Sequence, residues 1–294
     1  MSDAASPDIT PAAAGAPATA TAGGATQETT TVVEFTQVSK TYDTGYTAIK
    51  DVTFRVDDVP GHMEIVGILG PSGCGKSTVL RLIAGLTPQH PATTGIVKVM
   101  GKPVEAPGAD RGFVFQDYTS FDHRTVEQNI AFGLECRGTP ANERLELARD
   151  WIQKVGLDVK RDADKYPHEL SGGMRQRVAL ARTLVLKPRV ILMDEPFGAL
   201  DPKTRYAMQD QLVALSREVQ ATVFLVTHSI EEAVYVGDRL FVFSNAPGTI
   251  LQEMSIPAPD RPARVMQREP DFLDIVFSVR DLVEGLEMSD RAGT

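Results

Sequence analysis

The chain has 294 residues with 42% hydrophobic and 23% charged side chains, ordinary values for a globular protein of one or two domains. Its net charge of −9 disfavours nucleic acid and anionic lipid as non-specific partners, and its two cysteines imply no disulfide framework. Because no apolar run approaches the ~18 residues of a membrane span and no secretory signal is visible, we expect a cytoplasmic protein.

The first third of the chain divides into a polar leader and a strand-rich segment. Residues 1–31 are almost wholly Ala, Thr, Gly, Pro and Ser, which offer little to bury and predict a disordered tail. Order is expected from residue 32, where one strand-like stretch begins, followed by others at 49–56 and 96–100. Gly and Pro separate these stretches, so we predict a small antiparallel sheet.

Short apolar runs, nearly continuous rather than alternating, are typical of strands buried on both faces of a parallel sheet. Helical patterns lie between them, while residues 117–183 contain no convincing strand. The sequence therefore predicts one α/β domain over residues 32–290, with a helical subdomain inserted at about 117–183. The runs are 65–69, 112–115, 190–193, 222–227 and 240–243, and the helical patterns are 77–86, 142–155, 174–186 and 203–219.

A glycine-rich loop at residues 70–78 follows the strand at 65–69 and opens a helix. The pattern G-x-x-x-x-G-K-S in this context is typical of a phosphate-binding loop, because glycines let backbone N–H groups approach a phosphate. Lys76 would add a charge for the β- and γ-phosphates, and Ser77 a hydroxyl for Mg²⁺. Cys74 is either an activated thiol or a small residue that fills space, and we favour the second. The candidate nucleotide-binding residues here are Gly70, Pro71, Ser72, Gly73, Cys74, Gly75, Lys76, Ser77 and Thr78.

Two acids end the buried-type strand near residue 193. At the carboxyl end of a strand beside a phosphate loop, Asp194 can hold Mg²⁺ through water, and Glu195 can take a proton from an attacking water. A pair of solvated acids at a strand end is the alternative, which the neighbouring glycine loop disfavours.

A third pattern, LSGGMRQR, begins at residue 170. Ser171 is a good N-cap, and Gly172 and Gly173 leave N–H groups bare at the start of a helix, which suits an anion. The chain thus carries two patterns suited to phosphate but a single lysine loop. This leaves open whether it binds two nucleotides or half of each of two.

With these motifs, the chain resembles the nucleotide-binding subunit of ATP-binding cassette (ABC) transporters over about residues 32–287. LSGGMRQR is similar to the signature motif of that family. The resemblance implies a P-loop NTPase fold with a RecA-like core, an antiparallel β subdomain and the inserted helical subdomain. It also implies that two chains, identical or paralogous, pair head to tail, with each ATP between one phosphate loop and the other chain's signature motif.

The resemblance also implies roles for single residues. Tyr42 is similar to the aromatic residue that stacks on adenine, with core packing as the alternative. Gln116 corresponds to a hinge glutamine that touches Mg²⁺ and water, and Asp194 to the metal-side acid. Glu195 corresponds to the general base and His228 to a histidine that contacts the γ-phosphate. The residues implied to act across the dimer interface are Ser171, Gly172, Gly173 and Asp201.

The implied reaction is hydrolysis of ATP with Mg²⁺ by in-line water attack, with Glu195, His228, Lys76 and Gln116 as catalytic groups. Because the chain has no membrane segment, the permease would be a separate protein, with this subunit on the cytoplasmic face of the inner membrane. A solute-binding protein would act through that permease. An exporter subunit and a soluble ATPase without a transport role are alternatives, and the acidic charge argues against a nucleic-acid partner.

Several stretches, including VFQDYTSFDHRTVEQNIAFGL and DEPFGALDPKTR, resemble the nitrate/sulfonate/taurine importer subfamily. The expected cargo is therefore a small anionic solute. One departure stands out: where that subfamily usually has Leu-(Phe)-Pro-Trp before Arg-Thr, this chain has Ser-Phe-Asp-His at 120–123. That loop is expected to face the permease, so the departure leaves the usual partner contact and the cargo class open.

Overall fold

The computed structural model describes residues 30–58, 63–198 and 200–292 of the chain. The predicted tail lies outside these residues except for Thr30 and Thr31, which already belong to strand β1 (Thr30–Thr41). No helix in the described part of the chain combines the length and apolar character needed to cross a bilayer.

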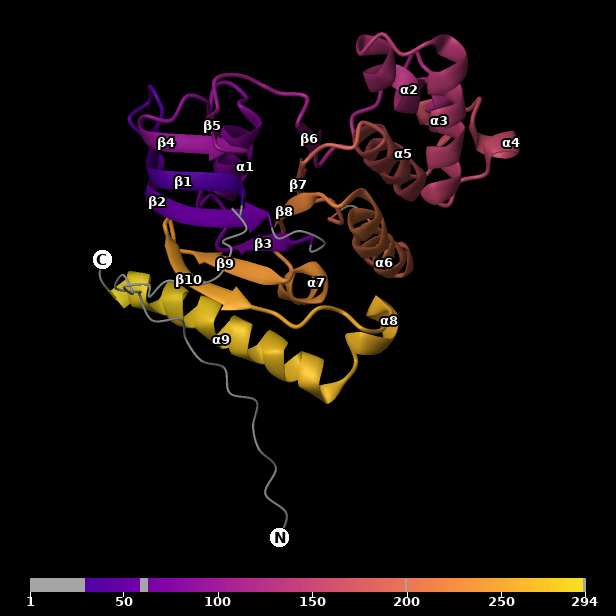
Figure 1. The fold of residues 1–294 in the computed structure, drawn as a ribbon. Coiled ribbons are helices and arrows are strands. Elements are labelled where there is room, and N and C mark those ends of the chain that lie inside the picture. Colours follow the sequence, from indigo (N-terminus) through magenta and orange to yellow (C-terminus); the bar gives the residue numbers. More distant parts are fainter. Residues whose placement is uncertain (1–29, 59–62, 199, 293–294) are drawn as a thin grey trace, which may run out of the picture.

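The antiparallel sheet predicted for the first third of the chain is present. Its strands are β1, β2 (Thr47–Asp58), β4 (Thr94–Val99) and β5 (Lys102–Pro103), in the order β2-β1-β4-β5. Its inner face is apolar and includes Phe35 and Phe54, whose rings stack with centroids 4.5 Å apart. This sheet packs over one side of the second sheet (Figure 1).

The second sheet is mixed. Its strands are β3 (Ile65–Leu69), β6 (Arg111–Val114), β7 (Val190–Asp194), β8 (Thr222–Val226), β9 (Arg239–Phe243) and β10 (Ile250–Ser255). Their order is β10-β9-β3-β8-β7-β6, in which β10 runs antiparallel to β9 and the other neighbours are parallel. The sequence patterns indicated all of these strands except β10. Residues in β10 alternate between half-buried and exposed, so it lacks the continuous apolar run of the others.

The continuous apolar runs are explained by burial on both faces. In β3, β7 and β8 every residue is buried. Val66 and Ile68 point into the cluster shared with the antiparallel sheet, whereas Ile65 and Leu69 point into the cluster shared with the helices on the opposite face. Each such side chain contributes about 1.5–3 kcal/mol on burial, which leaves no position in these strands for a polar residue facing water.

Helix α1 (Lys76–Ala84) packs between the two sheets, touching strands of both. It was predicted to extend to residue 86, but it ends at Ala84, because the capping residue Gly85 adopts a left-handed φ of 75° and closes the last turn. Further helices cover the opposite face of the mixed sheet, with α7 against β3 and α9 against α7 (Figure 1). These helices are α6 (Pro202–Val219), α7 (Ile230–Val236), α8 (Ala263–Met266) and α9 (Pro270–Ala292).

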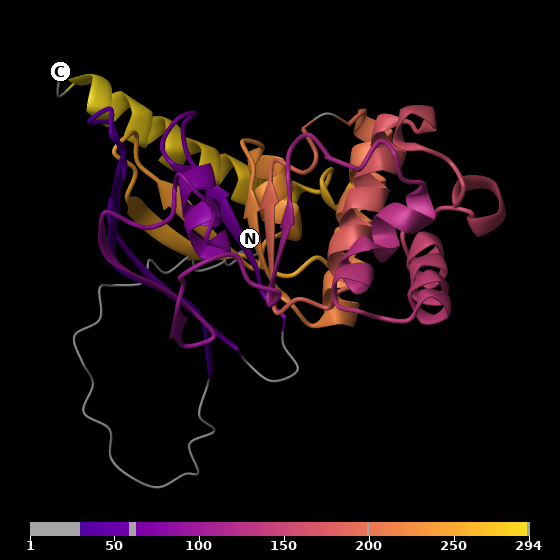
Figure 2. The same cartoon turned by 90° about the horizontal axis from the view of Figure 1, so that it is seen from above.

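Residues 117–184, which we call the helical region, contain no strand and project to one side of the sheets in both views (Figures 1 and 2). Its helices are α2 (Val126–Cys136), α3 (Ala141–Lys154), α4 (Val159–Asp162) and α5 (Gly172–Leu184), with a 3₁₀ turn at Pro167–Glu169. Trp151 and Ile152 of α3 are buried among α2 and α5. The region belongs to the same apolar cluster as one face of the mixed sheet, so it is packed onto the core rather than tethered to it.

Candidate functional site

The phosphate loop connects β3 to α1, as the sequence predicted. Gly75 has φ 93°, and a Cβ there would lie 2.5 Å from Ile49 Cγ2, so the loop is compatible only with glycine at this position. No side chain of the described residues caps α1, which leaves the N–H groups of its first turn available to an anion. The buried Lys76 ammonium donates to the carbonyl oxygens of Gly70 and Pro71, both at 2.8 Å, and thus lies folded over the loop.

Cys74 serves packing within this loop. Its side chain is 1% exposed and belongs to the apolar cluster beneath the antiparallel sheet. Burial raises the pKa of the Cys74 thiol, and this outweighs the opposing influence of the Lys76 charge. The structure therefore supports the space-filling interpretation of Cys74 over an activated thiol.

Ser77 and Asp194 meet at the base of the loop, 117 residues apart in the sequence. Ser77 Oγ donates to Asp194 Oδ1 at 2.9 Å, where α1 begins and β7 ends. Asp194 is buried, and this desolvation raises the pKa of its carboxyl group, opposed by the hydrogen bond from Ser77. The arrangement offers a hydroxyl and a carboxylate, the hard oxygen ligands that Mg²⁺ takes alongside water and phosphate.

Glu195, Gln116 and His228 converge although they come from different loops. Gln116 Nε2 donates to Glu195 Oε2 at 3.2 Å, and His228 Nδ1 lies 3.3 Å from the same oxygen. The three residues follow β6, β7 and β8, which are successive neighbours in the sheet, so their carboxyl ends meet at one edge.

The backbone of Glu195 is held in a sparsely populated conformation. Its φ is 49°, and its N–H donates to the carbonyl of Val226 at 2.9 Å, which ties the residue to β8. Such a left-handed non-glycine residue costs of order 1 kcal/mol and persists where its surroundings hold it. Its side chain is 28% exposed, which leaves the carboxylate accessible to water.

Two residues beside this cluster were not identified from the sequence. Tyr118 Oη and Gln176 Nε2 both donate to the carbonyl oxygen of Pro196, at 2.6 and 2.5 Å. Both side chains are buried, and Gln176 lies on α5, so the helix that begins at the signature motif is linked to the residue after Glu195. The sequence contains one signal that could have identified Gln176. It lies four residues before Leu180, which is buried, and is therefore a polar residue on the apolar face of a helix.

Tyr42 lies at the side of the phosphate loop, with Tyr42 Oη 3.3 Å from Thr78 Oγ1. Its half-buried ring is nearly parallel to that of Tyr46, with centroids 6.4 Å apart. Tyr46 Oη donates to the Gly73 carbonyl at 2.8 Å. Sequence reasoning missed Tyr46, which the structure adds to the aromatic group beside the loop.

The signature residues lie apart from this site within one chain. Ser171 caps α5 by accepting a hydrogen bond from the Met174 N–H at 3.4 Å, and Gly172 has open space where a Cβ would lie. Among the described residues, no hydrogen bond or ion pair joins residues 171–173 to residues 70–78. Both overall views place β6 and β7 between α1 and α5 (Figures 1 and 2).

Asp201, like the signature residues, makes no hydrogen bond or ion pair with Glu195, Gln116 or His228 in the part of the chain that the structure describes, and it serves instead as a helix cap. It caps α6 by accepting from the N–H groups of Lys203 and Thr204, both at 3.1 Å. The hydrogen bonds from Thr204 are the main cause that lowers the pKa of the exposed Asp201 carboxyl group. Ala199, two residues before it, lies outside the described residues.

Comparison with known proteins agrees with these features. A profile of the ABC transporter family matches residues 50–198. The nitrate import ATP-binding protein NrtD of Synechocystis is 42% identical over 250 residues, covering 83% of this chain and 90% of that protein. The taurine import ATP-binding protein TauB of Escherichia coli is 42% identical over 236 residues, covering 78% of this chain and 88% of that protein.

Solved structures support the same fold. A dimeric ATP-binding cassette in a post-hydrolysis state, bound to ADP and Pi, is 32% identical, with a TM-score of 0.66 over 77% of this chain and 100% of that one. The predicted α/β P-loop fold is thereby confirmed.

Proposed function

This chain belongs to the ABC transporter family, and we propose that it is the ATP-hydrolysing subunit of an importer. The cargo would be a small anionic solute of the nitrate, sulfonate or taurine type, entering through a separate membrane permease. Its similarity to nitrate and taurine import proteins supports this assignment. The observation that carries the ATPase role is the meeting of Gln116 and His228 at Glu195 Oε2, beside the phosphate loop.

In the proposed reaction, Glu195 accepts a proton from the water that attacks the γ-phosphoryl group. Gln116 and His228 hold its carboxylate in place through Oε2. When ATP binds, the Lys76 ammonium gives up its hydrogen bonds to the carbonyl oxygens of Gly70 and Pro71 and donates to phosphate oxygens instead. The uncapped N–H groups at the start of α1 bind the other phosphate oxygens. Phosphoryl transfer requires mainly such positioning and electrostatic stabilisation.

Ser77 and Asp194 fit a magnesium site. Their oxygens are 2.9 Å apart, and the buried Asp194 carboxylate has been stripped of solvent, which favours a cation beside it. When bound, Mg²⁺ would withdraw electron density from the phosphate oxygens. Asp194 and Ser77 themselves orient the loop against the end of β7.

We further propose that two chains complete each ATP site. The signature residues 171–173 stand at a helix N-terminus, exposed or half-buried, and in the described part of the chain they make no hydrogen bond to the phosphate loop. A second chain arranged head to tail would bring its residues 171–173 to the γ-phosphate bound by the first. The subunit would be held at the cytoplasmic face of the membrane by the permease, to which a solute-binding protein delivers the cargo.

A complementation experiment tests the composite site. Lys76→Ala disables the phosphate loop, and Gly172→Arg blocks the signature motif at a position where an added Cβ would have no atom of the described residues within 4 Å. Each variant alone should lack ATPase activity. A one-to-one mixture should recover about a quarter of the native phosphate release, because half of the dimers contain one intact site of two. Full activity of Gly172→Arg on its own would contradict the proposal, as would an inactive mixture in which heterodimers form.

A further inference from the structure

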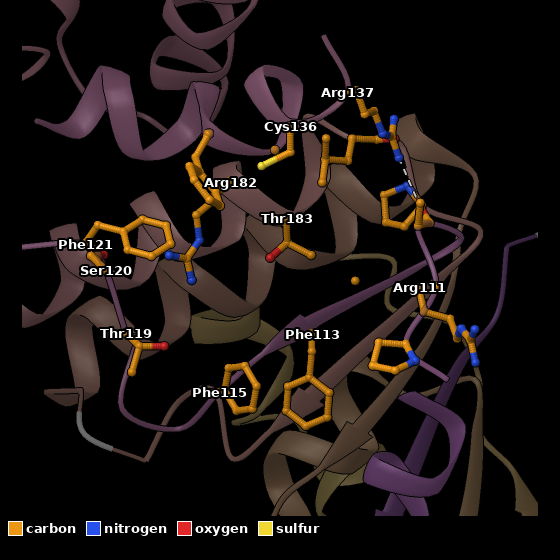
Figure 3. A pocket seen from close by; sticks show the side chains of 18 residues that line it. Arg111, Phe113, Phe115, Thr119, Ser120, Phe121, Cys136, Arg137, Arg182 and Thr183 are labelled. Carbon is orange, nitrogen blue, oxygen red and sulfur yellow. Dashed lines mark hydrogen bonds between the residues drawn. The ribbon is translucent and has the colours of Figure 1, made fainter. Parts of the chain in front are cut away.

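A polar cavity lies where the N-terminal halves of α6 and α7 meet, in contrast to the apolar groove that Phe113 and Phe115 line beside β6 (Figure 3). The cavity has a volume of about 160 Å³, and both Arg205 of α6 and Glu232 of α7 line it. Glu232 is only 5% exposed, and the reaction proposed above does not involve it. Because burying a carboxylate is unfavourable unless it is paired and hydrogen-bonded, its partners indicate its role.

The first partner of Glu232 is the segment that carries His228. Thr227 Oγ1 donates to Glu232 Oε2 at 2.6 Å and accepts from the Ser229 N–H at 3.1 Å. The hydrogen bonds of Thr227 and Ser229 therefore hold the backbone on both sides of His228. The His228 side chain is 68% exposed, although its Nδ1 lies 3.3 Å from Glu195 Oε2. Since packing does little to hold an exposed ring, the position of the imidazole depends on this backbone segment.

The second partner of Glu232 is Arg205, which also contacts the segment that carries Asp201. Arg205 Nε lies 3.5 Å from Glu232 Oε1, and Arg205 Nη2 donates to the carbonyl oxygen of Leu200 at 3.0 Å. This Nε atom is buried and has no hydrogen-bond partner within the described ranges, so the carboxylate of Glu232 supplies the charge that faces it. Leu200 directly precedes Asp201, which caps α6. One guanidinium thus touches both the Asp201 segment and the acid that holds the His228 loop.

The neighbouring acid of α7 makes no such connection. Glu231 is exposed and pairs with Arg280 at 2.8 Å. Burial raises the pKa of Glu232, and the hydrogen bond from Thr227 and the charge of Arg205 oppose this rise. A glutamine in place of Glu232 would still accept from Thr227 but would lose the attraction to Arg205. The two contacts of Glu232 can therefore be removed separately.

We propose that Glu232 and Arg205 are positioning residues for ATP hydrolysis, which join the segment carrying Asp201 to the loop carrying His228. A shift of the Asp201 segment, which by resemblance crosses the dimer interface, would then move the imidazole relative to Glu195. That consequence rests on the proposed function, whereas the link between the two segments follows from contacts within one chain.

The kinetic test removes each half of the link at nearly constant volume. Glu232→Gln and Thr227→Val should each lower kcat about tenfold with KM for ATP within about twofold, because the phosphate loop is untouched. Thr227→Ser keeps the hydroxyl and should stay within about twofold of the native kcat, as should the matched control Glu231→Gln. In a His228→Ala background, read in single turnovers with radiolabelled ATP, Glu232→Gln should change the rate less than about twofold, because its effect passes through His228.

Amide hydrogen exchange on the full chain tests the link without reference to activity. Arg205→Gln should speed exchange of residues 228–232 about fivefold, although Arg205 lies on another helix, because the loop loses its tie to α6. Glu231→Gln should leave the exchange of these residues at the native rate. The peptides are read by mass, and the melting temperature of each variant is measured alongside.

Three results would each overturn the proposal. They are a native kcat in Glu232→Gln, an undiminished effect of this change in the His228→Ala background, and native exchange of residues 228–232 in Arg205→Gln. Absence of ATPase activity from the native chain would instead contradict the proposed function, and the exchange of residues 228–232 would still decide whether Arg205 and Glu232 join the two segments.

Discussion

The edge of the mixed sheet and the helical region hold their functional residues in different ways. At the sheet edge, Gln116, Glu195 and His228 follow strands whose spacing is set by backbone hydrogen bonds, as between β6, β7 and β8. In the helical region, the loop before α2 and the signature motif depend on a few buried or capping polar side chains. Asn129, which is buried, accepts from the Phe121 N–H, and Ser171 caps α5. Substitutions at the sheet edge should therefore remove chemistry without moving the backbone, whereas those in the helical region should alter geometry and stability.

The largest expected effect is that of Glu195→Gln. Loss of the proton acceptor should lower phosphate release by about 10²- to 10³-fold, while nucleotide binding persists because the phosphate loop is unchanged. Turnover is measured by phosphate release and affinity with a fluorescent ATP analogue. A native rate in this variant would remove Glu195 from the role of base.

The link between the two regions is tested by Gln176→Leu. The Pro196 carbonyl would lose one of its two donors and the loop carrying Glu195 would be less well held, so kcat should fall about tenfold with KM for ATP within about twofold. Tyr118→Phe should have a similar effect, and the double variant a larger one. If KM rises while kcat stays unchanged, or if only the melting temperature changes, the hydrogen bonds to Pro196 do not position Glu195.

The dependence of the helical region on buried polar groups is tested by Asp162→Asn. The Asp162 side chain is fully buried and accepts from Arg161 and Lys165, and Arg161 in particular holds its pKa well below the ordinary range. A carboxyl group whose folded pKa is lowered stabilises the fold above its unfolded pKa of about 4 and loses this contribution as the pH falls further. The variant should be about 1–2 kcal/mol less stable at pH 7, with the gap narrowing below about pH 4.

The measurement is urea unfolding at a series of pH values, followed by the fluorescence of Trp151 in the neighbouring helix α3. Asp164→Asn, at an exposed position two residues on, serves as the matched control and should change stability little. A gap that stays constant from pH 7 to acid would show that Asp162 stabilises the region by packing rather than by charge.

The smallest effect is expected for Cys74→Ala, at the sheet edge. Because this thiol only fills space, ATP hydrolysis should stay within about twofold of the native rate. On the native chain, iodoacetamide should label the exposed Cys136 well before the buried Cys74, as read by peptide mass. Rapid labelling of Cys74 would indicate that the phosphate loop opens far more than its packing implies.

Much of the candidate site could be identified in advance because each part lies in a short contiguous pattern. Lys76 and Ser77 belong to the glycine loop, and Asp194 and Glu195 end an apolar run, so a local pattern is enough to mark them. The hydrogen bond from Gln176 to Pro196 spans 20 residues and could not be predicted from such a pattern. Strand β10 was missed for a related reason, since its half-exposed alternation becomes a strand only beside β9.

Contiguous segments thus specify which chemical groups the chain carries, because a glycine loop, an apolar strand and an N-cap each form through interactions between residues near in sequence. The meeting of Glu195 with Gln116 and His228 requires the order of strands in the sheet, which depends on pairing between distant segments. The same holds for Gln176, whose hydrogen bond to the Pro196 carbonyl requires α5 to pack beside the end of β7. Side-chain identity is local, whereas proximity and desolvation are set by long-range packing.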